Sequence, residues 1–305
     1  MKLSDALIGY WLDRETELAE RTAEKYKDVF HRFVEFIGNP EIEDISSKEI
    51  KRYLIHLAKE TTLSDRSISD QHPVLSSLWT WAENELGIEH IIRGKVSRPK
   101  YTKRQVEPVP PSDVRKLLNA CEWTKPYSNK PYSRNKRPTA LRDKAIILMM
   151  FDSGIRVSEL CNLNMRDYDA KRGRLHILHG KGDKQRFLTL GKRSHKALWR
   201  YVSSRDSPAT DEPLFTTGND SRMDRDQVRK MVGSAAKRAG IKHVHPHRLR
   251  HSFALQFLKN GGNVFELKEV MGHEKLETTM IYLMLSEMDL EDAQRRHSPA
   301  DKWKL

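Results

Sequence analysis

Basic side chains stand at predicted turns and helix starts, where they could hold an anion such as a phosphate. Arg156 follows a turn over 153–155, directly after an apolar segment with helical periodicity, and Lys181 lies between two glycines at the tip of a predicted hairpin. His247 and Arg250 are three residues apart, so they share one face of a predicted helix. A proline directly before His247 favours a helix start at this point. Backbone N–H groups and the helix dipole would attract an anion there.

A histidine and a tyrosine further along the chain extend this set. His273 follows Gly272 at the end of a short predicted helix, and Tyr282 lies nine residues later on the next helix. Taken singly, each of these residues has an ordinary structural explanation. Arg156 could be a surface arginine at a helix end, Lys181 a solvated turn residue and Tyr282 a core aromatic. Only the combination indicates a site.

Four histidines leave a metal site open as an alternative. His247 and His251 are four residues apart, and His243, His245 and His247 alternate, which are spacings that a metal ion can use. No run of carboxylates lies nearby to complete such a site, and the chain has only two cysteines. The sequence therefore predicts no bound metal. Two cysteines also exclude a disulfide framework and fit a reducing cytosol.

The charge of the chain indicates a polyanionic partner. Its 305 residues carry a formal net charge of +13 at pH 7, with 55 Lys and Arg against 42 Asp and Glu. The first 100 residues hold 15 basic and 18 acidic residues, whereas the remaining 205 hold 40 and 24. A positive field confined to the last two thirds favours nucleic acid as the partner of that part. No apolar run approaches the roughly 18 residues of a membrane span, so no membrane partner is expected.

The hydrophobic periodicity predicts a mainly α-helical protein in two parts. Residues 1–95 show helical stripes over about 3–12, 22–37, 47–57 and 67–86, which predict a helical N-terminal domain. Residues 96–111 are rich in proline and basic residues, and we expect a linker there.

Residues 112–305 form the second predicted domain. Its expected helices lie at 112–118, 141–152, 191–203, 224–239, 247–260, 264–271 and 276–286. Strands over 174–179 and 184–190, joined by the glycine-containing turn 180–183, predict one small β-hairpin. Residues 122–138 are polar, basic and contain proline, which is typical of a loop.

Four segments of the second part resemble, in order, the motifs of one enzyme family. Residues 153–160 (SGIRVSEL) resemble the first arginine box of the tyrosine recombinases, the phage-integrase and Xer-type family. The lysine hairpin, the His-x-x-Arg box and the closing box of that family are matched by 180–186 (GKGDKQR), 246–254 (PHRLRHSFA) and 271–274 (MGHE) with 278–282 (TTMIY). The likeness covers 153–282 densely, whereas 1–95 match only in size and helical character.

The resemblance implies phosphodiester transesterification. This chemistry adds negative charge to the nonbridging phosphate oxygens, so cations aimed at them stabilise the transition state. Arg156 and Arg250 would clamp these oxygens, because a guanidinium offers paired donors to a phosphate. His247 would add a donor or accept the tyrosine proton, and His273 would donate to the same phosphate.

The resemblance also implies a covalent intermediate. Tyr282 would be the nucleophile and form a 3′-phosphotyrosyl link, although a phenol with a pKa of about 10 needs a proton acceptor or nearby cations. Lys181 would protonate the departing 5′ oxygen. Glu159 would orient neighbouring site residues, and His251 would give packing or support. No cofactor is implied, because the cations replace a metal and the covalent link conserves the phosphodiester energy without ATP.

The family architecture gives further expectations. Residues 1–95 would be a core-binding, SAM-like DNA-binding domain and 112–305 the catalytic domain, with a tail over 286–305 that docks on a neighbouring protomer. The expected partners are double-stranded DNA and three further copies of the chain in a synaptic tetramer that resolves through a Holliday junction, from a monomer free in solution. An accessory DNA-bending protein or partner recombinase stays open. The expected location is the cytoplasm, at the nucleoid.

Two competing functions remain at this point. A type IB topoisomerase shares the chemistry but relaxes supercoils as a monomer. The separate helical first domain and the tail favour the recombinase. A sequence-specific DNA-binding protein that no longer cleaves would have lost at least one catalytic group, and the motifs show none lost.

Overall fold

A computed structural model of the protein describes residues 1–102, 107–124, 135–178, 185–285 and 298. The chain separates into two compact units, Met1–Arg104 and Gln105–Leu305. Each unit has its own hydrophobic core and is described by itself.

The first unit is helical throughout its ordered elements. They are α1 (Leu3–Arg14), α2 (Glu20–Ile37), a 3₁₀ turn (Ile42–Asp44), α3 (Ser47–Glu60), α4 (Asp65–Ser69) and α5 (Gln71–Leu86). The apolar stripes of these helices meet in a core whose largest fully buried side chains are Trp79, Tyr10, Tyr53 and Phe33. Ser46 caps α3 in a reciprocal pair with Glu49, which explains why this helix begins where it does.

The single helix expected over 67–86 is two helices in the structure. The break falls at Asp70, between α4 and α5. Pro73 explains it, because proline has no N–H and its ring would clash with the carbonyl of Ser69 in a continuous helix. In the first turn of α5 the same proline is tolerated.

The second unit begins with α6 (Pro111–Glu122), α7 (Ala140–Ser153), α8 (Val157–Asn162) and a 3₁₀ turn (Met165–Asp167). Three antiparallel strands follow in the order β1 (Tyr168–Asp169), β2 (Arg174–Ile177) and β3 (Arg186–Thr189). Arg174 pairs with Thr189 and Ile177 with Arg186. The remaining helices are α9 (Lys192–Val202), α10 (Arg225–Ala239), α11 (Pro246–Lys259), α12 (Val264–Met271) and α13 (Glu277–Leu285).

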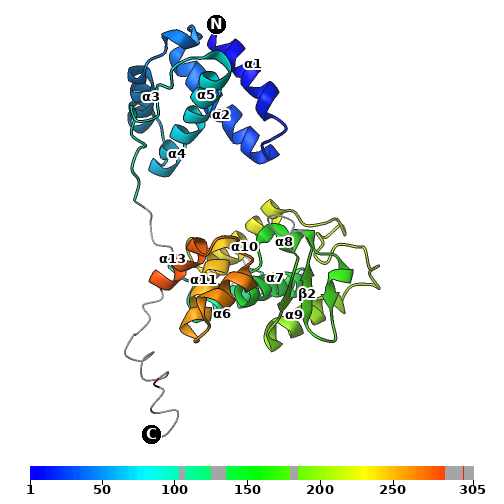
Figure 1. The fold of residues 1–305 in the computed structure, drawn as a ribbon. Coiled ribbons are helices and arrows are strands. Elements are labelled where there is room, and N and C mark those ends of the chain that lie inside the picture. The colour runs from blue at the N-terminus through cyan, green and yellow to red at the C-terminus, as the bar shows by residue number, and fades with distance from the viewer. Residues whose placement is uncertain (103–106, 125–134, 179–184, 286–297, 299–305) are drawn as a thin grey trace, which may run out of the picture. The chain divides into compact units, whose positions relative to one another are not determined.

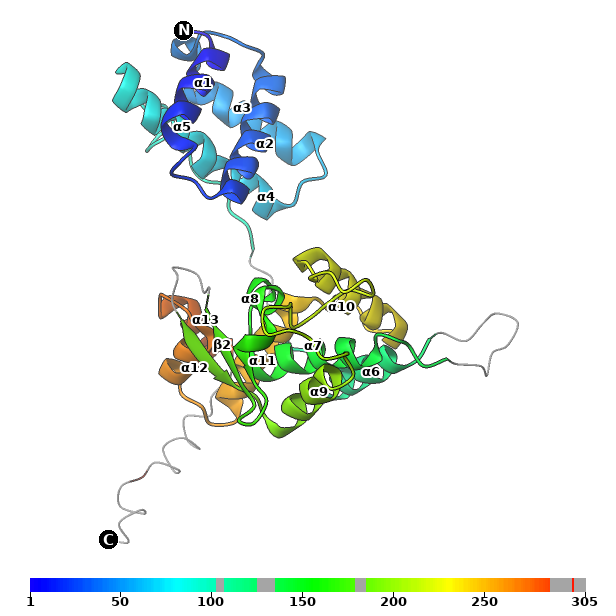
Figure 2. The same cartoon turned by 90° about the vertical axis from the view of Figure 1, so that its right-hand side faces the viewer.

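Helix α7 is the centre of this unit. Its sequence is apolar on nearly all sides, and Ile146, Ile147 and Met149 are fully buried. It packs against α6, α9 and α11, which lie around it in Figure 1, and Figure 2 shows α12 beside the sheet. The mainly helical fold with one small sheet is confirmed. The short helix α8 and strand β1 were not expected.

The expected boundaries of the linker, 96–111, fall around the division of the chain at Arg104. Most of the loop at 122–138, the tip of the hairpin and nearly all of the tail lie outside the described residues. No helix in the described part of the chain is long and apolar enough to span a bilayer.

Candidate functional site

Four elements that are distant in sequence bring the expected site residues together. Arg156 stands directly before α8, Arg250 on α11, His273 just after α12 and Tyr282 on α13. Arg156 Nη2 donates to the carbonyl of Gly272 at 2.6 Å, and Arg250 Nη2 donates to His273 Nε2 at 3.0 Å. The rings of His273 and Tyr282 are stacked with centroids 6.3 Å apart. Both arginines, one histidine and the tyrosine therefore form one cluster.

The turn between α7 and α8 shapes this cluster. Gly154 ends α7 with φ +61°, in the left-handed region, and its carbonyl accepts a hydrogen bond from Arg250 Nη1. A side chain at this position would overlap the ring of Phe253 on α11. Glycine is therefore required both by the backbone conformation and by the close approach of α11. The turn directs the side chain of Arg156 toward the carbonyl of Gly272. Gly272 also has a positive φ, of +62°.

Glu159 lies buried between Arg156 of this cluster and a further arginine, Arg186. Its carboxylate accepts from the backbone N–H of Arg156 at 2.9 Å and from Arg156 Nη1 at 2.7 Å. Arg186 donates to both carboxylate oxygens, at 2.9 and 2.8 Å, and its Nε donates to the carbonyl of Val270 at 3.0 Å. Burial by itself would raise the pKa of Glu159, but the bonds from Arg186 and Arg156 outweigh it and hold the pKa below its usual value. The carboxylate is therefore ionised at neutral pH.

Arg186 is the residue that the sequence analysis missed. It closes the segment 180–186 that resembles the lysine hairpin, but no role was expected for it. The residue it binds, Glu159, is 27 positions away. No local pattern in the sequence indicates this contact, because it joins β3 to α8.

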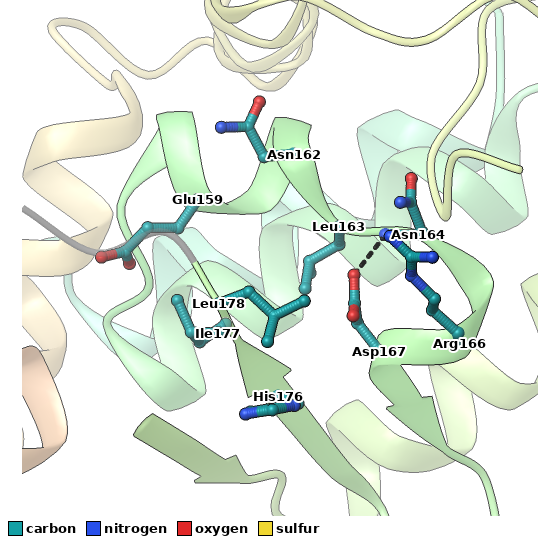
Figure 3. Close-up of a pocket in the computed structure, with 9 residues that line it drawn as sticks. All are labelled: Glu159, Asn162, Leu163, Asn164, Arg166, Asp167, His176, Ile177 and Leu178. Atoms are coloured by element: carbon teal, nitrogen blue, oxygen red, sulfur yellow. Dashed lines mark hydrogen bonds between the residues drawn. The ribbon is translucent and has the colours of Figure 1, made fainter. Parts of the chain in front are cut away.

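A small cavity of about 50 Å³ lies between α8, the 3₁₀ turn and β2, lined by Glu159, Asn162, Leu163, Asn164, Arg166, Asp167, His176, Ile177 and Leu178. Figure 3 shows the carboxylate of Glu159 pointing away from Asn164 and Asp167. A space of this size holds water but not a nucleotide. Ligand chemistry is therefore expected on the other side of Glu159, where its carboxylate meets the arginines.

The burial of Arg250 strengthens its field. The residue is 6% exposed, and burial and the nearby Arg156 lower its pKa to about 10, which still leaves it charged at pH 7. Hydrogen bonds to described residues use three of its five N–H donors and two of those of Arg156. Among the hydrogen bonds of the described residues, none uses the remaining donors of these two guanidinium groups.

His247 and His273 are neutral at pH 7. Burial, together with Arg250 and Arg156, lowers the pKa of His273 to about 4. Desolvation by the surrounding protein and the cation of Arg250 also lower the pKa of His247. Among the hydrogen bonds of the described residues, none joins His247 to another member of the cluster.

Tyr282 is half-buried against His251, with ring centroids 4.9 Å apart. Burial raises the pKa of its hydroxyl, although Arg250 and Arg156 act in the opposite direction. The phenol therefore stays protonated at neutral pH, and a proton acceptor is required if it attacks a phosphate. Lys181, the remaining expected site residue, lies outside the described residues. Within the described ranges, no group of three or more His, Cys, Asp or Glu could hold a metal ion.

The fold and the gathered residues define the tyrosine recombinase class. This chain belongs to the phage integrase family. A family model described as "Phage integrase family" matches residues 109–288, and one described as "Phage integrase, N-terminal SAM-like domain" matches residues 12–87. The resemblance inferred from the motifs is confirmed.

Relatives and solved structures agree with this membership. The tyrosine recombinase XerC of Corynebacterium glutamicum is 29% identical over 261 residues, 85% of this chain and 81% of that protein. XerC of Bacillus pumilus is 27% identical over 300 residues, 95% of this chain and 94% of that protein.

Two solved structures have the same fold. A crystal structure of a lambda integrase dimer bound to a COC′ core site has a TM-score of 0.75 at 17% identity, covering 92% of this chain and 95% of that one. The crystal structure of XerA recombinase has a TM-score of 0.51 at 24% identity, covering 97% of both chains.

Proposed function

We propose that this protein is a site-specific DNA recombinase that cuts and rejoins duplex DNA through a 3′-phosphotyrosine intermediate and a Holliday junction. The observation that carries the proposal is the cluster of Arg156, Arg250, His273 and Tyr282, which brings a potential nucleophile beside two phosphate-binding cations. The relatives named as tyrosine recombinases support the same activity.

The charge of the cluster suits the transition state better than the ground state. Arg156, Arg186 and Arg250 with the carboxylate of Glu159 leave about two positive charges near the site. A phosphodiester carries one negative charge, and its pentacoordinate transition state carries a second. Fixed cations that match the second charge lower the barrier rather than merely bind the substrate.

The proposed reaction begins with attack by Tyr282. The phenolic oxygen forms a bond to phosphorus, the bond to the 5′ oxygen breaks, and the phenol loses its proton. His247 is the proposed acceptor, because its lowered pKa keeps the imidazole neutral and able to take a proton at pH 7. Lys181 is the proposed donor to the leaving 5′ oxygen. Attack by a 5′ hydroxyl of the partner strand reverses each of these steps.

Glu159 and Arg186 are proposed as positioning residues. Glu159 holds the guanidinium of Arg156, and Arg186 fixes Glu159 from the other side while it binds the carbonyl of Val270 near Gly272. His251 packs on the ring of Tyr282 and is proposed to support it. None of these three is expected to touch the phosphate.

We propose that the reaction needs neither metal nor ATP, since the arginines supply the charge that a metal would provide. We also propose that residues 1–95 and 112–305 both bind double-stranded DNA, and that four copies assemble on two sites in the cytoplasm, at the nucleoid. Docking of 286–305 on a neighbouring copy is part of the same proposal.

A covalent-trapping assay tests the function. The protein is incubated with DNA from its own genetic neighbourhood, nicked so that the short 5′-OH fragment diffuses away after cleavage. A denaturing gel should then show a protein–DNA adduct for the natural protein and none for Tyr282→Phe. Tyr168→Phe is the matched control, since that buried hydroxyl has no hydrogen-bond partner among the described residues, and its adduct should persist. An adduct formed by Tyr282→Phe would overturn the proposal.

A further inference from the structure

Each ring nitrogen of His273 contacts a different polar group. Arg250 Nη2 stands 3.0 Å from Nε2, and Thr279 Oγ1 stands 2.8 Å from Nδ1. A guanidinium has donors only, so Nε2 must act as the acceptor. Since the ring is neutral, its one proton is then on Nδ1 and points at the hydroxyl of Thr279.

This tautomer cannot donate to a phosphate from the side that faces the arginines. The expected role of His273 as a phosphate donor needs the proton on Nε2, where Arg250 now donates. The structure therefore holds His273 in the form that is unable to perform its expected role. Something must stabilise the other tautomer when a phosphate is present.

The hydroxyl of Thr279 can form a hydrogen bond with either tautomer of His273. Thr279 is the third residue of α13 and is fully buried, at 0% exposed. A hydroxyl can accept one hydrogen bond and donate another. In the structure it accepts from Nδ1, and none of the hydrogen bonds among the described residues uses its own proton. A buried hydroxyl proton without a partner disfavours this form.

We propose that Thr279 is a positioning residue that reverses its hydrogen bond to His273 when a phosphate binds, so that His273 can donate from Nε2. The proposal rests on the proposed function. The ring gives the Nδ1 proton to solvent and takes one on Nε2, so its charge and composition do not change. Thr279 then donates to Nδ1, and a phosphate oxygen accepts from both Nε2 and Arg250. Every proton in this chain of groups then has an acceptor.

Several charged or titratable groups of the described residues face His273. They come from four elements and are Arg250 on α11, Arg156 and Glu159 at α8, Arg186 on β3 and Tyr282 on α13. The three arginines among them lower its pKa, whereas Glu159 acts in the opposite direction without outweighing them. The field of three arginines opposes a charged imidazole. A change of tautomer, which leaves the charge unchanged, is the change that this environment allows.

Three variants on one helix test the proposal in the trapping assay. Thr279→Val keeps the shape of the side chain but can neither donate nor accept, and we expect adduct formation to slow by about 10–100-fold at saturating DNA. Thr279→Ser keeps the hydroxyl and should recover most of the rate. Thr278→Val removes the neighbouring hydroxyl, which is exposed, and is the matched control that should leave the rate unchanged.

A double variant separates this role from a merely structural one. If Thr279 acts through His273, Thr279→Val should cause no further loss of rate in a His273→Phe background. A structural role would slow the double variant further, and that result would overturn the proposal. So would a Thr279→Val protein that folds and cleaves at the natural rate while Tyr282→Phe forms no adduct. If the natural protein forms no adduct at all, the proposed function itself fails.

The tautomer can also be observed without any substitution at position 279. Ring nitrogen-15 spectra of the full chain, assigned by comparison with His273→Phe, should show a protonated Nδ1 without DNA. With a bound duplex and Tyr282→Phe to prevent cleavage, the protonated nitrogen should be Nε2. An unchanged tautomer on DNA would overturn the proposal even if the Thr279→Val protein failed to fold.

Discussion

The prediction that most directly tests the buried charges concerns Arg186. Replacing it by methionine removes three hydrogen bonds, two to Glu159 and one to the carbonyl of Val270. The carboxylate stays buried, with a side chain that is 2% exposed, and keeps only the bonds from Arg156. Breaking a buried ion pair costs about 3–5 kcal/mol. Because Arg156 remains, we expect Arg186→Met to lose about 2–4 kcal/mol.

A second substitution should restore part of this loss. In Arg186→Met, the additional change Glu159→Gln removes the buried charge that has lost its main partner, so about 1–2 kcal/mol should return. In the natural protein the same Glu159→Gln change should destabilise, since it breaks a satisfied network. Arg172→Met is the surface control. Arg172 is exposed and lies 4.0 Å from Asp169, so its loss should cost about 0.5 kcal/mol or less.

The pH dependence of these stabilities has a defined sign. In the natural protein the pKa of Glu159 is held below its usual value, so its stabilisation is present above the unfolded pKa of about 4.3 and is lost as pH falls through the folded pKa. In Arg186→Met, burial should raise the pKa of Glu159. The destabilisation caused by the buried, charged carboxylate would then decrease as the pH falls. The stability difference between the two proteins should therefore be smaller at pH 5 than at pH 7.

Hydrogen exchange of the full chain under increasing denaturant measures these differences within the second unit. Peptides from α8 and β2 report the local free energy of opening, independently of the first unit. The reasoning is refuted if the double variant is no more stable than Arg186→Met, or if the difference from the natural protein grows on acidification.

Four further outcomes are expected. Arg250→Ala should slow adduct formation by roughly 10²–10³-fold or more, because it removes the buried cation that we propose binds the phosphate, and a near-natural single-turnover rate would contradict that role. Adduct formation should persist in EDTA, whereas dependence on Mg²⁺ would favour a metal site. The rate should fall as pH drops through the lowered pKa of His247, below about 6.5, and His247→Gln should lose this limb of the pH–rate profile. Gly154→Ala should destabilise by about 1–3 kcal/mol more than Gly240→Ala in thermal unfolding. Both glycines have positive φ, but only the first has Phe253 against it; equal losses would show that the clash is relieved.

The local sequence determined much of this protein. Apolar residues at helical spacing fix most helices, and alternating residues around two glycines fix the hairpin, because both periodicities depend only on neighbours along the chain. The motif residues Arg156, Arg250, His273 and Tyr282 could be chosen for the same reason, since each stands at a recognisable turn or helix position. The helix break at Asp70 could also have been predicted from the sequence, because Pro73 lies three residues after it.

The contacts between those elements were decided by the tertiary structure. Arg186 meets Glu159 only because β3 packs beside α8 and α12, and a separation of 27 residues has no periodicity that could reveal it. Thr279 forms a hydrogen bond with His273 because α13 folds back on the turn after α12. The tautomer of His273 is set by Arg250, which lies on a third element, α11. Hydrogen-bond partners depend on distances between side chains of different elements. A sequence can name the groups that could bond, and the packing of the helices decides which of them do.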